Sequence, residues 1–402
     1  MESNHQLPKD WRWVKVGEYV NSVKGKKPKR ISKEKSNECS IPYVNIKAFE
    51  KNIIDEYTDG VGCVLCDNGD FLMVWDGSRS GFVGKGIKGA LGSTLVKLDF
   101  PNIENNYVYY FLQSKFLDIN TRAKGVGIPH VDPNILWNYD LLIPPKPTQQ
   151  AIVSKIEEIF SDLDKGIEQL KTAQQQLKTY RQSVLKWAFE GKLTEENVKE
   201  GELPKGWYWV KIGDICKVVR GGSPRPAGDP KYYDGNIPFL KVADLTKDDG
   251  IYLTTFKYTI KEPGLHKTRR ISPNTLLLSN SGATLGVPKI CMIDATMNDG
   301  VAAFLELDAR SNHYLYYFWL SKTRELRNIN MGAAQPNLNT DIIRDYDVPY
   351  CSFGDQDNIV QEIESRLSVA DKMEESITQS LQQSEALRQS ILKRAFEGRL
   401  VK

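Results

Sequence analysis

The sequence lacks the short motifs that identify the commonest nucleotide-dependent enzymes. Its 402 residues contain no Gly-x-x-x-x-Gly-Lys-Ser/Thr phosphate loop, and no Gly-x-Gly-x-x-Gly follows a clear strand to open a helix. The glycine-rich segment 84–89 has the wrong spacing and is predicted to be a surface turn or hairpin. The Asn/Asp-Pro-Pro-Tyr/Phe tetrapeptide of amino-methyltransferases is absent too, since 229–232 reads Asp-Pro-Lys-Tyr. These absences argue against a catalytic chain.

Cysteine and histidine are both scarce, with six cysteines and four histidines scattered along the chain. This usage is typical of a reducing compartment and predicts no disulfide framework. Cys63 and Cys66 have the spacing of half a zinc site, but no second ligand pair follows, so both are predicted to be structural. No Ser/His/Asp grouping has support from a motif. We therefore expect neither a metal site nor a catalytic residue.

Long apolar runs and a secretion signal are missing as well. No segment approaches the roughly 20 apolar residues that span a bilayer, and the polar start Met1–Gln6 does not resemble a signal peptide. With 40% hydrophobic and 26% charged residues, the composition is that of a folded protein, which we expect in the cytoplasm. The formal net charge of +3 is too small to indicate a nucleic-acid partner by itself.

The sequence does contain a long internal repeat. The segment 7–17, Leu-Pro-Lys-Asp-Trp-Arg-Trp-Val-Lys-Val-Gly, returns at 203–213 as Leu-Pro-Lys-Gly-Trp-Tyr-Trp-Val-Lys-Ile-Gly, an offset of 196 (203 − 7). The segment 107–112 returns at 314–319 with an offset of 207 (314 − 107). The second copy therefore gains a net 11 residues (207 − 196) between these markers.

A further matched block ends each copy, because 181–193 returns at 388–400. Several blocks in one order cannot plausibly arise by chance, so the chain is a tandem duplication of a globular part followed by a helical part. Each copy is large enough to bury its own core. The predicted boundaries are 1–148 for the first globular part, 149–202 for the first helix and connector, 203–355 for the second globular part and 356–402 for the second helix.

A long helix is predicted from Ile152 to Trp187, where the sequence has no proline and one glycine, Gly166. Apolar residues recur in it at intervals of three and four, which is the pattern of a narrow coiled-coil seam, and a weaker stripe follows in the second copy. Packing the helices on each other buries both stripes most simply, and the alternative is that each helix lies on its own globular part. The residues predicted to form the helix–helix contact are Ile152, Ile156, Ile159, Leu163, Leu170, Leu177, Val184, Ile359, Ile363, Ile377, Leu387 and Ile391.

Each globular part mixes short apolar runs with turn residues. The runs 93–98 and 275–279 are predicted to be strands, and Tyr107–Ile119 and Tyr314–Ile329 to be helices. The predicted fold class is therefore α+β: two mixed α/β domains, each followed by a long helix, with the helices packed as an antiparallel coiled coil.

The spacing of the repeats predicts a circular arrangement with pseudo-two-fold symmetry. Nine residues, 194–202, connect Leu193 to Leu203. Two residues follow the last repeat and six precede the first, so joining the ends would give a connection of eight (2 + 6). We therefore expect the two ends of the chain to lie about as close together as Leu193 and Leu203.

Motifs that close and open the helices occur in both copies. Ala-Phe-Glu-Gly-Lys-Leu at 188–193 and Ala-Phe-Glu-Gly-Arg-Leu at 395–400 close them, Leu-Pro-Lys-Gly-Trp at 203–207 opens the second domain, and Ile-Val begins the helices at 152–153 and 359–360. In this layout the chain resembles, over essentially its full length, the specificity subunits of type I restriction–modification enzymes. The duplicated order of the motifs is more specific than any one of them.

The resemblance implies a non-catalytic protein whose two target-recognition domains each read one half of a split, asymmetric sequence in double-stranded DNA. It also implies that the helices set the unread spacer and bind two modification subunits, which carry S-adenosylmethionine and methylate adenine. Restriction subunits would join the complex and supply cleavage and translocation with ATP and Mg. This chain would bind no cofactor itself, in agreement with the missing catalytic motifs.

Candidate DNA contacts lie in loops that correspond between the copies, with 76–81 paired to 279–284 and 124–130 paired to 331–337. Lysine near a duplex mostly neutralises phosphates, whereas arginine and side-chain amides also address base edges. Solvated basic turns, or drift in idle loops, are the alternative. The predicted contacts are Lys24, Lys26, Lys27, Lys29 and Arg30 with Arg220 and Arg225; Ser78 and Arg79 with Asn280 and Ser281; Lys124 and His130 with Gln335 and Asn337; and Arg269 and Arg270 in the stretch that carries the insertion.

Two other classes of function remain open. One is an interaction scaffold, with two adhesive domains on a coiled coil and no DNA role, and salt-dependent duplex binding would separate it from a DNA reader. The other is a repeated enzyme with an unrecognised site, which methyl transfer or DNA cleavage by the purified chain would support.

Overall fold

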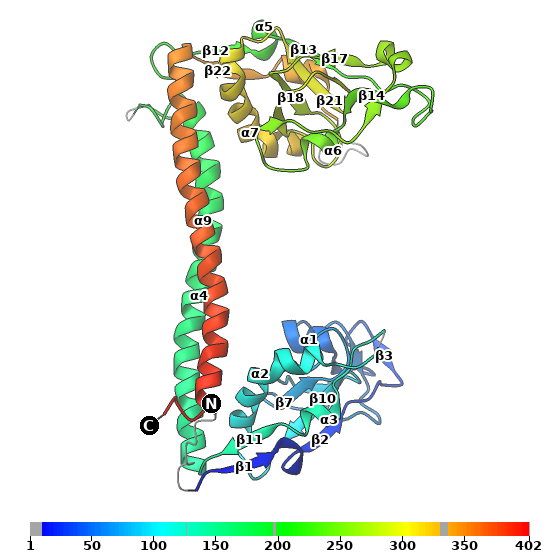
Figure 1. Cartoon of the computed structure of the whole chain (residues 1–402), viewed down its shortest axis with the longest axis vertical. Coiled ribbons are helices and arrows are strands. Elements are labelled where there is room, and N and C mark those ends of the chain that lie inside the picture. Colours follow the sequence, from blue (N-terminus) through cyan, green and yellow to red (C-terminus); the bar gives the residue numbers. More distant parts are fainter. Residues whose placement is uncertain (1–9, 126, 196–197, 330–336, 402) are drawn as a thin grey trace. The chain divides into compact units, whose positions relative to one another are not determined.

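The computed structural model describes residues 10–125, 127–195, 198–329 and 337–401. The chain forms two compact units: unit 1 comprises Met1–Lys171 with Thr378–Lys402, and unit 2 comprises Thr172–Ile377. Each unit combines one globular domain with a part of both long helices (Figure 1). Nowhere in the described residues is a helix long and apolar enough to cross a membrane.

The first domain, in unit 1, is built on two sheets. An antiparallel sheet has the order β2-β10-β7-β8, a second sheet has the order β3-β5-β4-β9-β6, and β1 and β11 form a ribbon that leads to the long helix. The apolar face of α2 packs on the first sheet, where Tyr107 and Phe111 are buried in the main core. The elements are β1 (Arg12–Lys15), η1 (Val16–Glu18), β2 (Asn21–Lys24), β3 (Ile31–Ser32), β4 (Ile41–Val44), α1 (Ile46–Lys51), β5 (Tyr57–Thr58), β6 (Leu65–Cys66), β7 (Phe71–Val74), β8 (Val83–Lys85), β9 (Gly89–Leu91), β10 (Leu95–Asp99), α2 (Asn105–Thr121), α3 (Pro133–Leu136) and β11 (Asp140–Ile143).

The second domain, in unit 2, repeats this plan, but among the described residues its first sheet has five strands instead of four and its second sheet has four instead of five. Its sheets have the orders β13-β21-β18-β19-β15 and β16-β14-β20-β17, and β12 and β22 form the ribbon. The elements are β12 (Tyr208–Lys211), α5 (Ile212–Ile215), β13 (Lys217–Arg220), β14 (Tyr233–Leu240), α6 (Val242–Leu245), β15 (Tyr252–Leu253), β16 (Thr259–Ile260), η2 (Glu262–Lys267), β17 (Arg269–Ile271), β18 (Thr275–Ser279), β19 (Pro288–Cys291), β20 (Ala295–Met297), β21 (Val301–Leu305), η3 (Ala309–Ser311), α7 (Asn312–Ile329), α8 (Thr340–Arg344) and β22 (Asp347–Tyr350). The two strands and two helices predicted in the globular parts are thus confirmed as β10, β18, α2 and α7. The segment 84–89 comprises the end of β8, a short turn at 86–88 and the first residue of β9, and the two strands belong to different sheets.

Strand registers locate the insertion in the second copy. In the first domain Tyr43 of β4 and Leu65 of β6 both pair with Ala90 of β9. In the second domain Phe239 of β14 and Arg270 of β17 both pair with Thr296 of β20. The offset therefore rises from 196 (239 − 43) to 205 (270 − 65), so nine of the eleven extra residues lie between these strands. They supply β15, which pairs parallel with β19 and adds the fifth strand.

Both long helices are present, and each has 44 residues: α4 spans Lys146–Phe189 and α9 spans Phe353–Phe396. A helix of that length extends about 66 Å. Each helix leaves its own domain and ends in the core of the other unit. In unit 1 Phe396 packs edge-on against Tyr107, with ring centroids 5.1 Å apart, and in unit 2 Phe189 packs in the same way against Tyr314 at 5.2 Å. The Ala-Phe-Glu-Gly motifs therefore fix the end of each helix to a globular domain.

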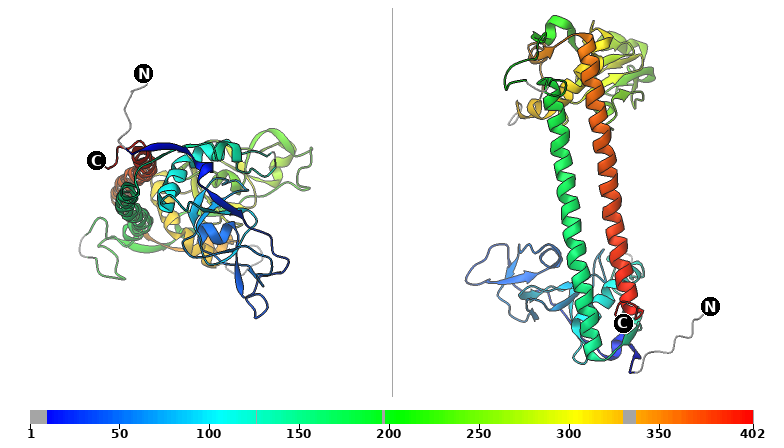
Figure 2. Two further views of the ribbon diagram at one scale, coloured as in Figure 1. Left: turned by 90° about the horizontal axis from the view of Figure 1, so that it is seen from below. Right: turned by 90° about the vertical axis from the view of Figure 1, so that its left-hand side faces the viewer.

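Within each unit α4 and α9 run antiparallel and side by side, as predicted (Figure 1, Figure 2). In unit 1 Arg388 of α9 pairs with Asp164 of α4. In unit 2 Arg181 of α4 pairs with Asp371 at 2.6 Å and Glu374 at 2.9 Å, both of α9. Arg388 and Asp371 are the repeat counterparts of Arg181 and Asp164, so one cross-helix ion pair occurs twice.

The predicted seam is buried near the ends of the helices and half-buried between them. The buried members are Ile152, Ile156, Val184, Ile359, Ile363 and Ile391, and the half-buried ones are Ile159, Leu163, Leu170, Leu177 and Ile377. The prediction is wrong for Leu387, which is 50% exposed. Arg388 takes the inward position instead, because its guanidinium lies over the Phe160 ring, 4.3 Å from the centroid, and pairs with Asp164. Near their ends the helices contact both each other and a domain core, so both predicted modes of packing occur.

The described ends of the chain meet inside unit 1. Leu400 and Val401 pack on the core that also holds Trp11, and a Cβ added at Gly398 would lie 3.6 Å from the Trp11 ring. In unit 2 the counterpart of Gly398, Gly191, lies directly against Pro204 of the connector. The expected proximity of the chain ends is confirmed for the described residues.

Candidate nucleic-acid interface

Three of the predicted segments lie together in the first domain. Lys24, at the end of β2, pairs through Nζ with Oδ2 of Asp76 at 2.8 Å. Asp76 forms a β-bridge with His130, and the Gly77 amide donates to the carbonyl of Pro129 at 2.8 Å. Lys124 pairs with Asp132 at 2.7 Å. The loops 76–81 and 124–130 and the end of β2 therefore form one surface.

A glycine follows β2 and β13 because the backbone passes very close to a neighbouring strand there. A Cβ at Gly25 would lie 2.2 Å from the carbonyl oxygen of Gly92, and one at Gly221 would lie 2.2 Å from that of Asn298. Any larger residue would push the following loop away from the sheet. The two basic loops thus start from the same constrained point, which explains why Lys24 and Arg220 correspond.

The basic loop after β2 carries exposed lysines on either side of a buried proline. Lys26, Lys27 and Lys29 are exposed, whereas Pro28 is buried and holds the loop to the domain. Arg30 pairs with Glu38 at 2.9 Å. Across the described ranges no ion pair involves any of the three lysines, so their ammonium groups are available to neutralise phosphates.

In the loop 76–81, Ser78 and Arg79 are both exposed. The Arg79 guanidinium lies over the Phe82 ring, 4.0 Å from the centroid, and its Nη1 donates to Oε2 of Glu50 at 3.3 Å. The loop backbone is fixed by Asn120 at the end of α2, whose amide donates to the carbonyls of Ser78 and Ser80. This arginine is therefore held in place and remains accessible.

In the second domain three of the predicted arginines are linked by a series of contacts that begins at Asp299. Arg220 donates through Nε to the carbonyl of Asp299, Arg225 pairs with the Asp299 carboxylate at 3.8 Å, and Arg269 donates to the Arg220 carbonyl at 3.2 Å. Arg270 faces Asp294 in a two-pronged contact of 3.0 and 2.7 Å, which lowers the pKa of Asp294. Arg220, Arg225 and Arg269 thus form one cationic surface, whereas the charge of Arg270 is already neutralised.

Two predictions in the second domain need correction. Asn280 is fully buried, so its side chain is not presented to a base edge. The pairing of 76–81 with 279–284 is also wrong by two residues. The amide of Gly81 bonds to Val74 and that of Gly286 to Ser279, both at 2.7 Å, which sets an offset of 205.

The offset of 205 aligns 76–81 with 281–286, so Arg79 corresponds to Thr284. The pairing of the other loop is consistent with the structure, since Ser281 bridges Asn337 as Asp76 bridges His130. Asn337 is exposed and Ser281 is half-buried. The predicted contact Gln335 lies outside the described residues.

A second group of cations lies in this domain, and the sequence singles out Lys267 in the basic stretch with His266 but not Lys241 or Lys257. Lys267 lies 4.3 Å from the centroid of the Tyr232 ring and bonds to its hydroxyl at 3.1 Å, and Lys241 lies 3.6 Å from the Tyr258 ring. The hydrogen bond from Lys267 lowers the pKa of the Tyr232 hydroxyl. Lysine–tyrosine pairs in the sequence, such as Lys231-Tyr232 and Lys257-Tyr258, were the available signal. We call Tyr232, Tyr258, Lys241, Lys257 and Lys267 the lysine–tyrosine lobe.

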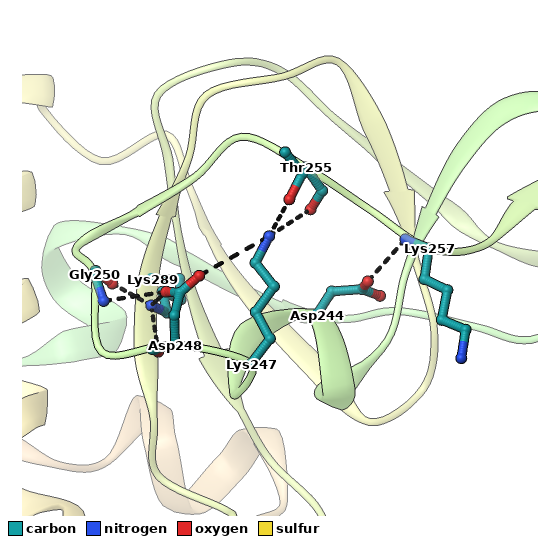
Figure 3. A network of polar contacts seen from close by, with 7 residues as sticks. All are labelled: Asp244, Lys247, Asp248, Gly250, Thr255, Lys257 and Lys289. Atoms are coloured by element: carbon teal, nitrogen blue, oxygen red, sulfur yellow. Dashed lines mark hydrogen bonds and ion pairs between the residues drawn. The ribbon is translucent and has the colours of Figure 1, made fainter.

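The inserted segment that adjoins this lobe is held by a buried lysine (Figure 3). Lys289 on β19 is 2% exposed, and its Nζ donates to the carbonyl of Asp248 at 2.9 Å, to its carboxylate at 2.7 Å, and to the carbonyl of Gly250. These contacts lower the pKa of Asp248. The Asp244 carboxylate accepts from the Lys257 amide at 2.9 Å and so ties the insertion to the lobe.

No grouping of histidine, cysteine or acidic residues that could hold a metal ion occurs in the part of the chain that the structure describes. Cys66 is buried, and burial raises the pKa of its thiol to about 11, which keeps it protonated. Its Sγ bonds to the carbonyl of Gly89 at 3.5 Å and so helps to join β6 to β9.

The fold and these surfaces together define a duplicated recognition protein, in which loops of different charge are mounted on two similar domains. A family model for the type I restriction modification DNA specificity domain matches the chain twice, at residues 8–179 and 204–383. These matches cover more than half of the chain, which therefore belongs to this family and, like it, is a recognition protein rather than an enzyme.

Relatives and solved structures agree with the family. The MjaVIII specificity subunit of Methanocaldococcus jannaschii is 25% identical over 412 residues, covering 98% of this chain and 94% of that protein. The EcoBI specificity subunit of Escherichia coli is 25% identical over 355 residues, covering 82% and 73%. Two similar folds are a structure from a study of type I R-M complex assembly (TM-score 0.74, 21% identity, 98% and 100% covered) and the HsdS subunit from Thermoanaerobacter tengcongensis (TM-score 0.60, 20% identity, 99% of each covered).

Proposed function

We propose that this protein is the DNA-specificity subunit of a type I restriction–modification complex, and that each domain reads one half of a bipartite, asymmetric site in double-stranded DNA. One observation carries the proposal: both domains hold the loop after β2 or β13 and the loop 76–81 or 281–286 on one frame, but the charged and polar side chains on these loops differ. The bridges Asp76–His130 and Ser281–Asn337 lie at matching positions of that frame. Two readers of different half-sites require this arrangement. An adhesive scaffold gives no reason for conserved frames with cationic, divergent loops.

We further propose that the chain contributes recognition and that its partners contribute catalysis. Modification subunits would carry S-adenosylmethionine and methylate adenine, and restriction subunits would use ATP and Mg, all in the cytoplasm. The cross-helix ion pair that occurs once in each unit supports two equivalent docking places on α4 and α9, hence two copies of the modification subunit. The pair of 44-residue helices would set the length of the unread spacer between the half-sites.

Methylation mapping tests this function directly. Cells with and without the gene for this chain are compared, with the partner genes present in both. We expect a methylated motif of two specified halves around an unspecified spacer, present only when the chain is expressed. The purified complex should bind that duplex, and the logarithm of its binding constant should fall linearly with the logarithm of the salt concentration. A motif that persists without the chain, or duplex binding without sequence preference, would contradict the proposal.

A further inference from the structure

The guanidinium of Arg79 is exposed but fixed in orientation, as a base-reading arginine needs to be, and Glu50 and Phe82 fix it. We propose that Arg79 reads a guanine in the half-site of the first domain, and that Glu50 and Phe82 are positioning residues that fix the plane and rotation of its guanidinium. The inference rests on the proposed function and adds to it a base, a reading residue and the residues that hold it.

The geometry constrains the guanidinium in two independent ways. The Phe82 ring lies 4.0 Å from Cζ of Arg79 and sets the plane, and Phe82 is itself packed edge-on against Phe49 of α1 with centroids 5.9 Å apart. The Glu50 carboxylate, at 3.3 Å from Nη1, then sets the rotation within that plane. An arginine held this way loses less side-chain entropy on binding than a freely moving one.

The constraint leaves the reading edge available. The Arg79 side chain is 47% exposed, and in the described structure its one hydrogen bond uses Nη1. A guanidinium has five N–H donors in a planar fork, and two of them match O6 and N7 of guanine in the major groove. A lysine at this position would bring the charge without the fork.

Glu50 is placed to orient Arg79 and not to touch DNA itself. Its side chain is 13% exposed, Oε2 faces Arg79, and Oε1 is buried with no hydrogen-bond partner among the described residues. A half-satisfied carboxylate beside a surface for an anionic duplex is unfavourable for stability and for phosphate binding. Its single contact with Arg79 accounts for its position.

The second domain lacks the whole arrangement although it keeps the loop. At the offset of 205, set by the shared backbone hydrogen bonds, Arg79 corresponds to Thr284 and Phe82 to Val287. At the offset of 196, which applies up to α6, Glu50 corresponds to Thr246. The reading residue and both positioning residues are absent together, as expected if they act as one unit that serves one half-site.

Duplex binding by the complex reconstituted with its modification subunits tests the proposal. The duplexes carry the methylated motif, all single base-pair changes in the first-domain half, and 7-deazaguanine, which lacks N7, at each guanine. We expect one guanine whose replacement by 7-deazaguanine weakens wild-type binding, and whose substitution by other bases loses about 5- to 150-fold. Arg79→Ala should become indifferent to both changes at that position, and Arg79→Lys, which keeps the charge but not the planar fork, should discriminate less than the wild type.

The positioning role is tested by Glu50→Gln, which keeps the size and removes the charge. We expect this variant to lose most of the discrimination at the same guanine and at no other position, with the slope of affinity against salt unchanged. The matched control is Thr284→Ala in the second domain, which should leave the first half-site untouched. Thermal melting of each variant separates folding from reading.

Each outcome has a defined meaning. A uniform weakening on every duplex in Arg79→Ala would make Arg79 a phosphate contact and overturn the proposal, as would a first half-site without a 7-deazaguanine-sensitive position. A lower melting temperature in Glu50→Gln with unchanged discrimination would make Glu50 merely structural. Failure of the wild-type complex to prefer its motif would instead refute the proposed function.

Discussion

The two recognition domains share a frame and differ in how they hold their positive charge. In the first domain Lys26, Lys27 and Lys29 project from a loop and have no ion-pair partner in the described residues. In the second, Arg220 and Arg225 are gathered by Asp299, and an inserted segment adds cations stacked on tyrosine rings. A lysine without an ion-pair partner can neutralise any nearby phosphate, whereas an arginine held by hydrogen bonds or a lysine stacked on a ring can contact DNA at one defined position.

This contrast indicates which parts of each domain can change freely. Both copies share the ribbon, the helix α2 or α7, and four strands of the sheet that contains β7 or β18, and backbone hydrogen bonds of this frame hold the loops. The insertion lies between β14 and β17 and adds β15 at the edge of the second domain's sheet, beside β19, so the strands that the two copies share keep their pairing. Under the proposed function, loop replacement would therefore change specificity and leave the frame intact.

The largest effect should come from exchanging a whole domain. Replacing residues 1–148 with the same region of a homologue should change one half of the methylated motif completely and leave the other half and the spacer unaltered, because each domain has its own core. Methylation mapping of cells that express the chimera measures this. Simultaneous change of both halves would contradict the comparison of two independent readers.

The next effect is on salt dependence. Replacing Lys26, Lys27 and Lys29 with alanine should weaken binding to all duplexes and make the slope of log K against log salt shallower by about one unit per lost phosphate contact. Binding titrations from low to high salt provide the measurement.

The matched control for the three lysines removes the same charge from the same domain. It replaces the ion-paired Lys15, Lys47 and Lys97, whose carboxylate partners lie at 2.7, 2.6 and 2.6 Å. A slope that changes equally in both triple variants would show that total charge, and not the basic loop, sets the affinity.

A smaller effect is expected at the insertion. Lys289→Met should destabilise the second domain by about 2 kcal/mol, because two carbonyls and the Asp248 carboxylate lose their donor. The first domain has Gly84 at this position and no inserted segment to hold. Urea unfolding measures the change, with Lys205→Met at an exposed position of the second domain as the control, expected within about 0.5 kcal/mol. Equal effects of the two substitutions would remove the assigned role of Lys289.

Much of the architecture was predictable because the repeat carries the information twice. The strand 275–279, the helices α2 and α7 and the antiparallel long helices all follow from periodicity and repeat order. The prediction of a buried seam residue was wrong at Leu387, because the neighbouring Arg388 faces inward and stacks on Phe160. The spacing of apolar residues cannot predict that the flat guanidinium of an arginine packs at an inward position of the helix.

The candidate interface was less predictable, since its loops depend on contacts between distant segments. The alignment of 76–81 was displaced by two residues because the two loops share only their two glycines, and hydrogen bonds from Gly81 and Gly286 were needed to correct it. The burial of Asn280 and the stacking of Lys267 on Tyr232 depend on the same tertiary contacts. Local sequence identifies cationic loops but not the partners that hold each cation.

The smallest expected effect, no change in specificity at all, concerns the chain ends and the connector. In unit 1 Gly398 lies beside Trp11, and in unit 2 its counterpart Gly191 lies beside Pro204, so the ends and the connector have equivalent surroundings. A circular permutant that joins Lys402 to Met1 and opens within 194–200 should therefore fold and direct methylation to the unchanged motif. A chain with the same joining linker inserted at 194–200 but with its original ends serves as the control. If that control is active while the permutant is unfolded or methylates a different motif, the ends and the connector are not equivalent, and the circular arrangement predicted from the repeat is wrong.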